Sequence, residues 1–179
     1  MTESLRGKLL LAGPGLKDPN FERTVVLLTE HNEDGAMGLV LNRPSNATVG
    51  DAVPDLTWVA DAGDPVFIGG PVAPNGVIVL AEWDDPAQAV VRVEPDLGFV
   101  PGDLDDASAV RRARVYAGHS GWGPGQLEAE LEEEGWIVEA PRREELFSDD
   151  PEGLWAAVLR RMGRQFRLLS TMPPDPSLN

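Results

Sequence analysis

The apolar residues of this chain gather in short runs of strand length that end at turn-forming residues. Residues 7–12 form the first run, which stops at a Gly-Pro-Gly turn, and residues 24–30 form a second, β-branched run without polar alternation. Continuous apolar runs of this length are typical of strands buried on both faces. Turn residues at 32–35 then lead into a returning run over 36–42, which predicts a hairpin.

The rest of the pattern mixes further strands with helices. Strands are predicted at 65–68, 76–80, 112–117 and 136–138, with weaker ones near Val90 and Phe99. Helical segments are predicted at 49–53, from 103 to 110, at 126–131 and from about 150 onward. No linker divides the chain and no repeat is visible. We therefore predict one domain over residues 1–172 and a flexible tail over residues 173–179.

The last helix is predicted from its cap and its apolar stripe. Asp149 or Asp150 can cap its N-terminus, and Pro151 suits its first turn. The stripe that would face the core consists of Leu154, Trp155, Val158, Leu159 and Met162.

Charge changes the picture of possible partners. The chain has 30 acidic and 15 basic residues, a net charge of −15, so a nucleic acid would be repelled except at a local basic patch. Arg160, Arg161, Arg164 and Arg167 form such a cluster. If the helix continues past Gly163, three of them share one face and could dock DNA or an acidic partner. Alternatively, they stabilise a helix C-terminus and pair with the chain's own carboxylates. No helix-turn-helix pattern precedes the cluster.

Composition also bears on compartment, metal and cofactor. The chain has no cysteine, its first residues are polar, and no apolar run approaches the length of a bilayer span, so we expect a cytoplasmic protein. The two histidines are far apart, and the acidic runs match no EF-hand loop. No metal site and no cofactor are predicted.

The segment 118–125 is the first candidate ligand site. We predict a glycine-rich loop between a strand and a helix N-terminus, where free N–H groups can hold a carboxylate or phosphate. The candidate binding residues are Gly118, His119, Ser120, Gly121, Trp122, Gly123 and Gly125. It is not a Walker loop, because no Gly-Lys-Ser/Thr follows. The alternative is a structural loop whose glycines take positive φ, with Trp122 in the core.

Ser120 also raises the possibility of a hydrolase. A nucleophile elbow needs G-x-S-x-G, but Trp122 occupies the last position of that pattern. The only candidate bases are His31, expected at a hairpin turn, and His119, which is adjacent in sequence. The sequence thus completes no catalytic constellation, and a hydrolase centred on Ser120 stays an alternative.

Arg23, Asn42 and Arg43 form a secondary candidate cleft. They flank the predicted hairpin and can meet at one end of the sheet. The default explanation is an arginine–carboxylate pair with Asp18 or Glu30, and a functional cleft is the alternative.

Several stretches of the sequence together resemble a known bacterial family. They are GKLLLA at 7–12, DPNF at 18–21, RTV at 23–25, GAMGLVLNRP at 35–44, GGPV at 69–72, GHSGWGPGQL at 118–127, and LW and RRMG in the last helix. In these stretches, which span essentially the whole chain, the sequence resembles the YqgE/AlgH family. The resemblance implies a compact α+β fold with a curled, mixed sheet, partly closed like a barrel and surrounded by helices.

The resemblance says less about function. The family is often described as transcriptional regulators because one member was linked to alginate production, and it has no established catalytic residues or cofactor to carry over. Our leading hypothesis is a non-enzymatic regulatory or binding protein that acts through a protein partner or a small anionic ligand. The alternatives are a DNA-binding regulator that uses the C-terminal arginines and a hydrolase centred on Ser120.

Overall fold

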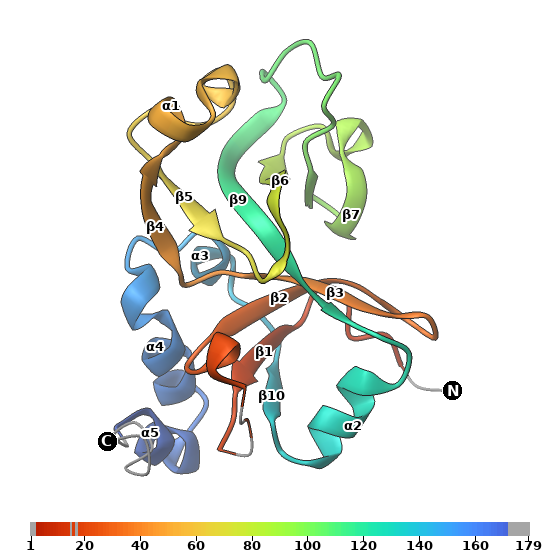
Figure 1. Ribbon diagram of the computed structural model, residues 1–179, viewed down its shortest axis with the longest axis vertical. Helices are drawn as coiled ribbons and strands as arrows, with labels where there is room; N and C mark the ends of the chain where they lie inside the picture. Colours follow the sequence, from red (N-terminus) through yellow and green to blue (C-terminus); the bar gives the residue numbers. More distant parts are fainter. Residues whose placement is uncertain (1–2, 15, 17, 172–179) are drawn as a thin grey trace.

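The computed structural model describes residues 3–14, 16 and 18–171. In this part of the chain, ten strands form one sheet in the order β10-β1-β2-β3-β9-β6-β8-β7, with β5 paired to β9 and β4 paired to β5 (Figure 1). The strands are β1 (Leu9–Ala12), β2 (Val25–Asn32), β3 (Gly35–Val40), β4 (Pro44–Thr48), β5 (Pro65–Ile68), β6 (Val72–Trp83), β7 (Val90–Glu94), β8 (Leu97–Phe99), β9 (Val110–Trp122) and β10 (Trp136–Glu139).

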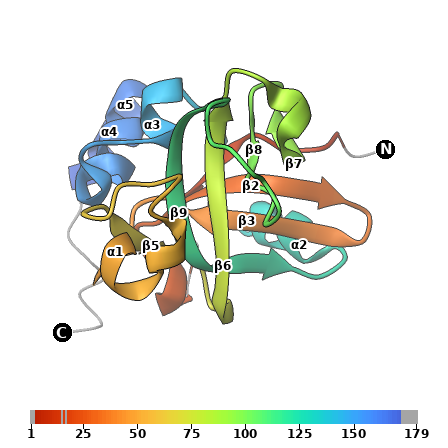
Figure 2. The same ribbon diagram turned by 90° about the horizontal axis from the view of Figure 1, so that it is seen from above.

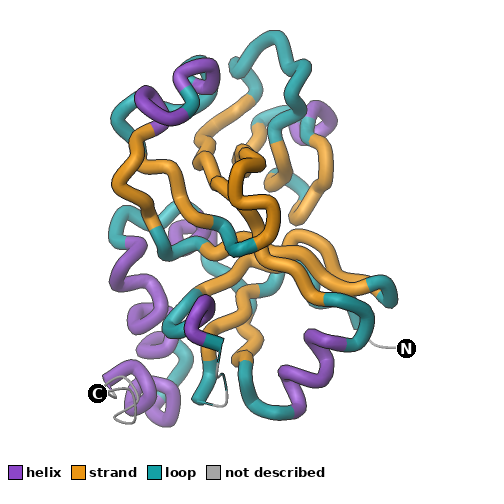
Figure 3. The backbone as a smooth tube through the Cα atoms, viewed as in Figure 1, coloured by secondary structure: helices purple, strands orange, loops and turns teal. Residues whose placement is uncertain are grey.

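Short helices surround this sheet, as the tube drawing shows (Figure 3). The α-helices are α1 (Val49–Ala52), α2 (Gln126–Glu132), α3 (Arg143–Leu146), α4 (Leu154–Arg161) and α5 (Arg164–Thr171). The 3-10 turns are η1 (Pro19–Phe21), η2 (Pro54–Leu56), η3 (Pro86–Gln88) and η4 (Pro151–Gly153).

The half of the sheet that contains β10, β1, β2 and β3 is covered on both faces. Alternate residues of β1 and β2 pack on one side against α4, where Trp155, Val158 and Leu159 are buried. The intervening residues pack on the other side against Leu127 of α2 and two tryptophans. This explains the continuous apolar runs in the sequence, because both faces of these strands are buried. The predicted hairpin is confirmed as β2 and β3.

The long strand β9 connects the two halves of the sheet. Its first part pairs with β6 and, in parallel, with β5, while its last residues pair with β3. Figure 2 shows β9 and β6 running across the direction of β2 and β3. The transition lies near Gly118, whose φ of 71° is left-handed. A Cβ at Gly118 would collide with the carbonyl oxygen of Gly70, and one at Gly70 would collide with His119, so glycine permits this close crossing.

The predicted fold class is confirmed in part. The protein is a single α+β domain, and the parallel pair β5–β9 makes its mostly antiparallel sheet mixed. The sheet is not closed into a barrel, because its path ends at β10 on one side and at β7 on the other. The expectation of partial barrel closure is therefore corrected to an open, strongly bent sheet.

The C-terminal helix forms with the predicted cap and core stripe but ends earlier than its charge pattern suggested. The Asp150 carboxylate accepts a bond of 3.2 Å from the backbone N–H of Gly153 at the start of this segment. At Gly163, φ is 127°, and a separate helix, α5, begins at the next residue.

Two other expectations concern the irregular parts of the chain. The helix predicted from 103 to 110 does not form, because this segment is irregular until β9 begins at Val110. The predicted tail, 173–179, lies outside the described residues, as does Met172. Among the described residues, no helix has the length and apolar character to cross a membrane.

Candidate functional site

The structure places most of the segment 118–125 in a strand instead of a loop. Residues up to Trp122 belong to β9, and Gly125, whose φ is 75°, precedes α2. Trp122 is buried in the core beside α2, which is the structural alternative that we described for this residue. The predicted loop is therefore wrong for residues 118–122. Ligand binding by this segment stays a prediction.

The residues of the hydrolase alternative are engaged elsewhere. The Ser120 side chain is fully buried, and its hydroxyl donates to the carbonyl oxygen of Gly69 at 3.0 Å. His31 lies on β2, where its Nδ1 accepts from the backbone N–H of Leu5 at 2.9 Å. Its Nε2 lies 2.7 Å from the Glu128 carboxylate, so Nδ1 acts as acceptor and Nε2 as donor. The geometry does not support a Ser120–His31 nucleophile and base.

Arg23, Asn42 and Arg43 do come together, as predicted. Asn42, which follows β3, is hydrogen-bonded to the start of β2. Its Oδ1 accepts from the backbone N–H of Val25 at 3.0 Å, and its Nδ2 donates to the Arg23 carbonyl at 2.9 Å. The Arg23 guanidinium lies over the Trp155 ring, 5.2 Å from its centroid. Arg43 donates to a backbone carbonyl, and burial lowers its pKa while two nearby carboxylates oppose that shift. These contacts fasten the end of the hairpin to α4.

The C-terminal arginines do not share one helical face. Arg160 is at the end of α4, whereas Arg164 and Arg167 belong to α5 beyond the break at Gly163. Arg161 is engaged by Glu145, whose two carboxylate oxygens accept bonds of 2.6 and 2.8 Å from its guanidinium. The expected continuous basic face is therefore corrected: the exposed arginines are divided between α4 and α5, and Arg161 is partly buried and pairs with Glu145 and Glu139.

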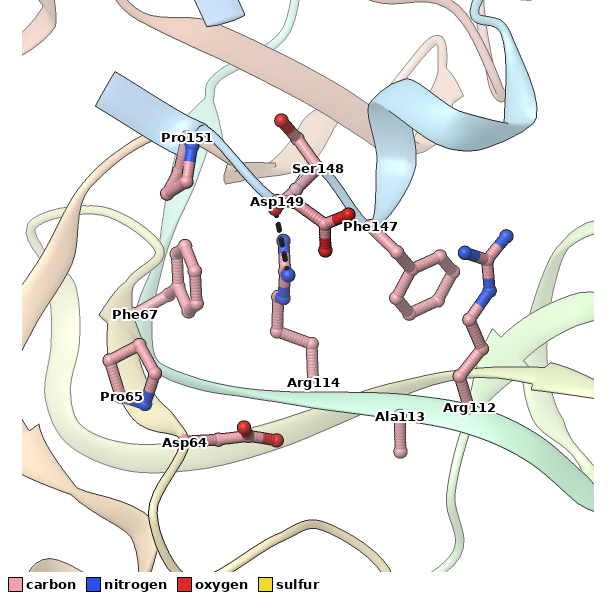
Figure 4. A pocket seen from close by; sticks show the side chains of 10 residues that line it. All are labelled: Asp64, Pro65, Phe67, Arg112, Ala113, Arg114, Phe147, Ser148, Asp149 and Pro151. Carbon is pink, nitrogen blue, oxygen red and sulfur yellow. Dashed lines mark hydrogen bonds between the residues drawn. The ribbon is translucent and has the colours of Figure 1, made fainter. Parts of the chain in front are cut away.

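A pocket of about 370 Å³ lies between β5, β9 and the connection from α3 to η4. One wall carries Pro65 and Phe67 from β5, and Arg112 and Arg114 from β9 (Figure 4). Phe67 is paired with Tyr116 across the two strands, so alternate residues of β9 face this side.

The opposite wall is the connection from α3 to η4. It presents Phe147, Ser148, Asp149 and Pro151 to the pocket. The pocket volume is near the lower end of the range of about 300–1,000 Å³ that is usual for small-molecule sites.

Arg114 dominates the electrostatics of this pocket. Figure 4 shows its side chain between the rings of Phe67 and Phe147. Its Nη2 donates to the carbonyl oxygen of Ser148 at 2.9 Å, and its guanidinium lies 4.5 Å from the centroid of the Phe67 ring. Its Nη1 is buried without a hydrogen-bond partner among the described residues, none of which forms an ion pair with it. The guanidinium therefore keeps hydrogen-bonding capacity that no described residue uses.

Arg112 is held at the edge of the pocket by contacts on two sides. Its guanidinium lies 4.7 Å from the centroid of the Phe147 ring, and its Nη2 lies 3.3 Å from the buried carboxylate of Glu82. Arg111 and Arg143 approach the same carboxylate, at 3.2 and 3.4 Å. Glu82 therefore positions Arg112 and neutralises part of its charge.

Tyr116 lies next along the same face of β9. Its ring is fully buried and lies 5.7 Å from that of Phe67, and its hydroxyl has no hydrogen-bond partner among the described residues. Burial raises the pKa of the phenol, and the nearby charge of Arg114 opposes this shift. The phenol is therefore neutral at physiological pH, and the positive charge of Arg114 is not balanced from this side.

Asp64 and Asp149 provide negative charge at the pocket, from opposite walls. Both residues are exposed. Within the described chain, neither forms an ion pair with Arg112 or Arg114. The pocket therefore combines two guanidiniums and two carboxylates that do not pair with one another.

We did not predict a site at this pocket from the sequence. We predicted 112–117 as a strand but gave no function to the arginines at alternating positions of that strand. Arginines at alternating positions of a strand that then becomes apolar indicate a charged, partly covered sheet face, and this pattern could have suggested the site.

Comparison with known proteins places the chain in a family. A family model described as AlgH-like matches residues 9–167, which include the strands and the connection that form the pocket. The chain belongs to the AlgH-like family. The resemblance found in the sequence motifs is thereby confirmed.

Relatives within the AlgH-like family match over nearly their full length. A UPF0301 protein of Streptomyces coelicolor is 46% identical, over 100% of this chain and 98% of that protein. A UPF0301 protein of Thermobifida fusca is 39% identical, over 98% of this chain and 96% of that protein.

Two solved structures share the fold. The X-ray structure of a Corynebacterium diphtheriae protein has a TM-score of 0.84 at 28% identity, covering 96% of this chain and 94% of that one. The solution structure of the AlgH protein from Pseudomonas aeruginosa has a TM-score of 0.74 at 30% identity, covering 97% and 98%.

Proposed function

We propose that this AlgH-like protein binds a small organic anion in the pocket between β5, β9 and the α3–η4 connection, and that it acts as a binding protein with a regulatory function. The observation that carries the proposal is the environment of Arg114. Its guanidinium is stacked on Phe67 and fixed by Ser148, yet no carboxylate of the described chain forms an ion pair with it.

Arg114 carries a partly buried charge that has no ion-pair partner among the described residues. Such a charge is unfavourable unless it is paired, and a bound carboxylate or phosphate would supply the missing partner. Because Arg114 is held in place before binding, little side-chain entropy would be lost when an anion binds. Preorganisation of this kind supports a ligand-binding arginine more than a purely structural one.

We propose binding instead of catalysis because the candidate nucleophile is not available. The Ser120 hydroxyl is buried and donates to a backbone carbonyl, away from the residues that line the pocket. The glycine-rich segment 118–125 is therefore not part of the proposed site.

A thermal-shift screen tests the proposal. Wild-type protein is heated with small organic carboxylates, amino acids and inorganic phosphate, and each hit is repeated with Arg114→Met and with Arg160→Met. Arg160 is exposed at the end of α4, so its variant is a charge-matched control. A ligand at 100 times its Kd adds about 2.7 kcal/mol, a shift of about 5–10 °C for a domain of this size.

We expect at least one of these anions to stabilise the wild type and the Arg160 variant but not the Arg114 variant. Circular dichroism shows whether the Arg114 variant is folded. The proposal is wrong if none of the anions shifts the wild type, or if a folded Arg114→Met protein responds as the wild type does.

A further inference from the structure

The charges of the pocket favour a more specific class of ligand. Two of the residues that line it are cationic, Arg112 and Arg114, and two are anionic, Asp64 and Asp149. A simple anion would gain from the guanidiniums but would be repelled by the carboxylates. A ligand that carries both an anionic and a cationic group would find a partner for each.

Arg114 is the least exposed of these four charged residues, because Arg112 is exposed at the edge of the pocket. Arg114 is partly covered and stacked on Phe67, whereas Asp64 and Asp149 are exposed. Figure 4 shows the Asp149 carboxylate beside the Arg114 guanidinium and Asp64 on the opposite wall, lower in the view than Arg114. An anionic group would therefore lie inward, at Arg114, and a cationic group would lie outward, between the acidic side chains.

We infer that the pocket binds a zwitterion of the amino-acid class, with its carboxylate at Arg114 and its ammonium at Asp64 and Asp149. This inference rests on the proposed function, because it adds a second charge to the ligand of the same site. The net charge of −15 supports it, since a zwitterion is not repelled at long range as an anion is. Pro65 and Pro151 supply apolar surface for the rest of the ligand.

Matched probes test this inference. The twenty common amino acids are titrated into the full chain by calorimetry, and the tightest binder is compared with its deamino acid and with its decarboxylated amine. A double variant, Asp64→Asn with Asp149→Asn, removes the acidic pair. Its control, Asp61→Asn with Glu152→Gln, changes the net charge equally at exposed residues that do not line the pocket.

We expect the amino acid to bind at least about fivefold more tightly than either analogue, because each lacks one charged contact. The acidic double variant should weaken binding of the amino acid by about fivefold or more, and it should not weaken binding of the deamino acid, because the carboxylates that repel an anion are removed. The control double variant should bind the amino acid as the wild type does.

The remaining outcomes separate the two proposals. If the deamino acid binds as tightly as the amino acid, or if the acidic double variant keeps full affinity, the zwitterion inference is wrong and binding of an anion stands. If no amino acid binds, the zwitterion inference is wrong, and the thermal-shift screen with the other anions decides the proposed function. Binding of the amine as tight as that of the amino acid would also contradict the zwitterion inference, because the carboxylate contact at Arg114 would then contribute nothing.

Discussion

Glu130 of α2 connects two buried tryptophans, and its removal should destabilise the protein measurably. Its Oε1 accepts hydrogen bonds from the indole Nε1 of Trp122 at 3.1 Å and of Trp136 at 2.9 Å. These tryptophans are only 6% and 4% exposed, and they pack edge to face, with centroids 6.0 Å apart. Glu130 thus fastens α2 to two strands through two charge-assisted bonds.

The cost of Glu130→Ala follows from these contacts. Each buried indole N–H that loses its acceptor costs about 1–3 kcal/mol. Because Glu130 itself is half-buried, water can reach part of the site, so the lower end of this range applies to each indole. We expect a loss of about 2–3 kcal/mol in the free energy of unfolding, or about 5–10 °C in Tm. Urea unfolding followed by tryptophan fluorescence measures it, and Glu132→Ala, an exposed change on the same helix, is the control.

A mutant cycle between Glu130 and the two tryptophans tests whether the lost indole hydrogen bonds cause the destabilisation. If the cost arises from the two indoles, then Glu130→Ala in a Trp122→Phe, Trp136→Phe background should cost less than about 1 kcal/mol. An equal cost in both backgrounds would refute the proposed origin. So would a Glu130→Ala protein as stable as its Glu132→Ala control.

Two further predictions concern stability. Gly118→Ala should cost at least about 1–2 kcal/mol in urea unfolding, because alanine disfavours the left-handed φ and its Cβ would meet the Gly70 carbonyl; a neutral effect would contradict the close crossing. The hydrogen bond from His31 lowers the pKa of Glu128 below its usual value of 4.5. The ionised carboxylate therefore stabilises the fold above about pH 4.5, and this stabilisation is lost as the pH falls through the lowered pKa. Unfolding measured from pH 3 to 7 should show Glu128→Gln less stable than wild type near neutrality and equal to it at the acidic end; a constant difference would contradict this.

The strands of the first half of the sheet could be predicted because both of their faces are buried. Burial on two sides leaves an unbroken apolar run in the sequence, as in residues 24–30, and the turn residues that follow identify the hairpin. The short helix α1 and the capped start of the last helical segment also left local patterns that predicted them correctly.

Glycine was less informative, because the same residue permits loops, kinks and close crossings. Residues 118–122 suggested a loop, but Gly118 allows β9 to pass close to Gly70 while the strand continues. Gly163 is compatible with a continuing helix at a modest cost, yet here it separates α4 from α5. Tertiary contacts decide whether a glycine forms a loop, a kink or a close crossing, and the local sequence carries no information about those contacts.

The pocket could not be assembled from local patterns for the same reason. Arg114 and Ser148, which form its main hydrogen bond, are 34 residues apart in sequence. The pairing of β5 with β9 brings Phe67 beneath Arg114, and this pairing is parallel and crosses much of the chain. An alternating pattern predicts that Arg112 and Arg114 share a face, but it does not predict what covers them.

An NMR titration shows directly whether Arg114 and its pocket bind a small organic anion. The tightest binder from the screen is titrated into isotope-labelled protein, with wild type and Arg114→Met compared side by side. We expect saturable chemical-shift changes at Phe67, Arg114 and Ser148 in the wild type, and their loss in the variant. Shifts centred on 118–125 instead, or identical shifts in both proteins, would contradict this proposal.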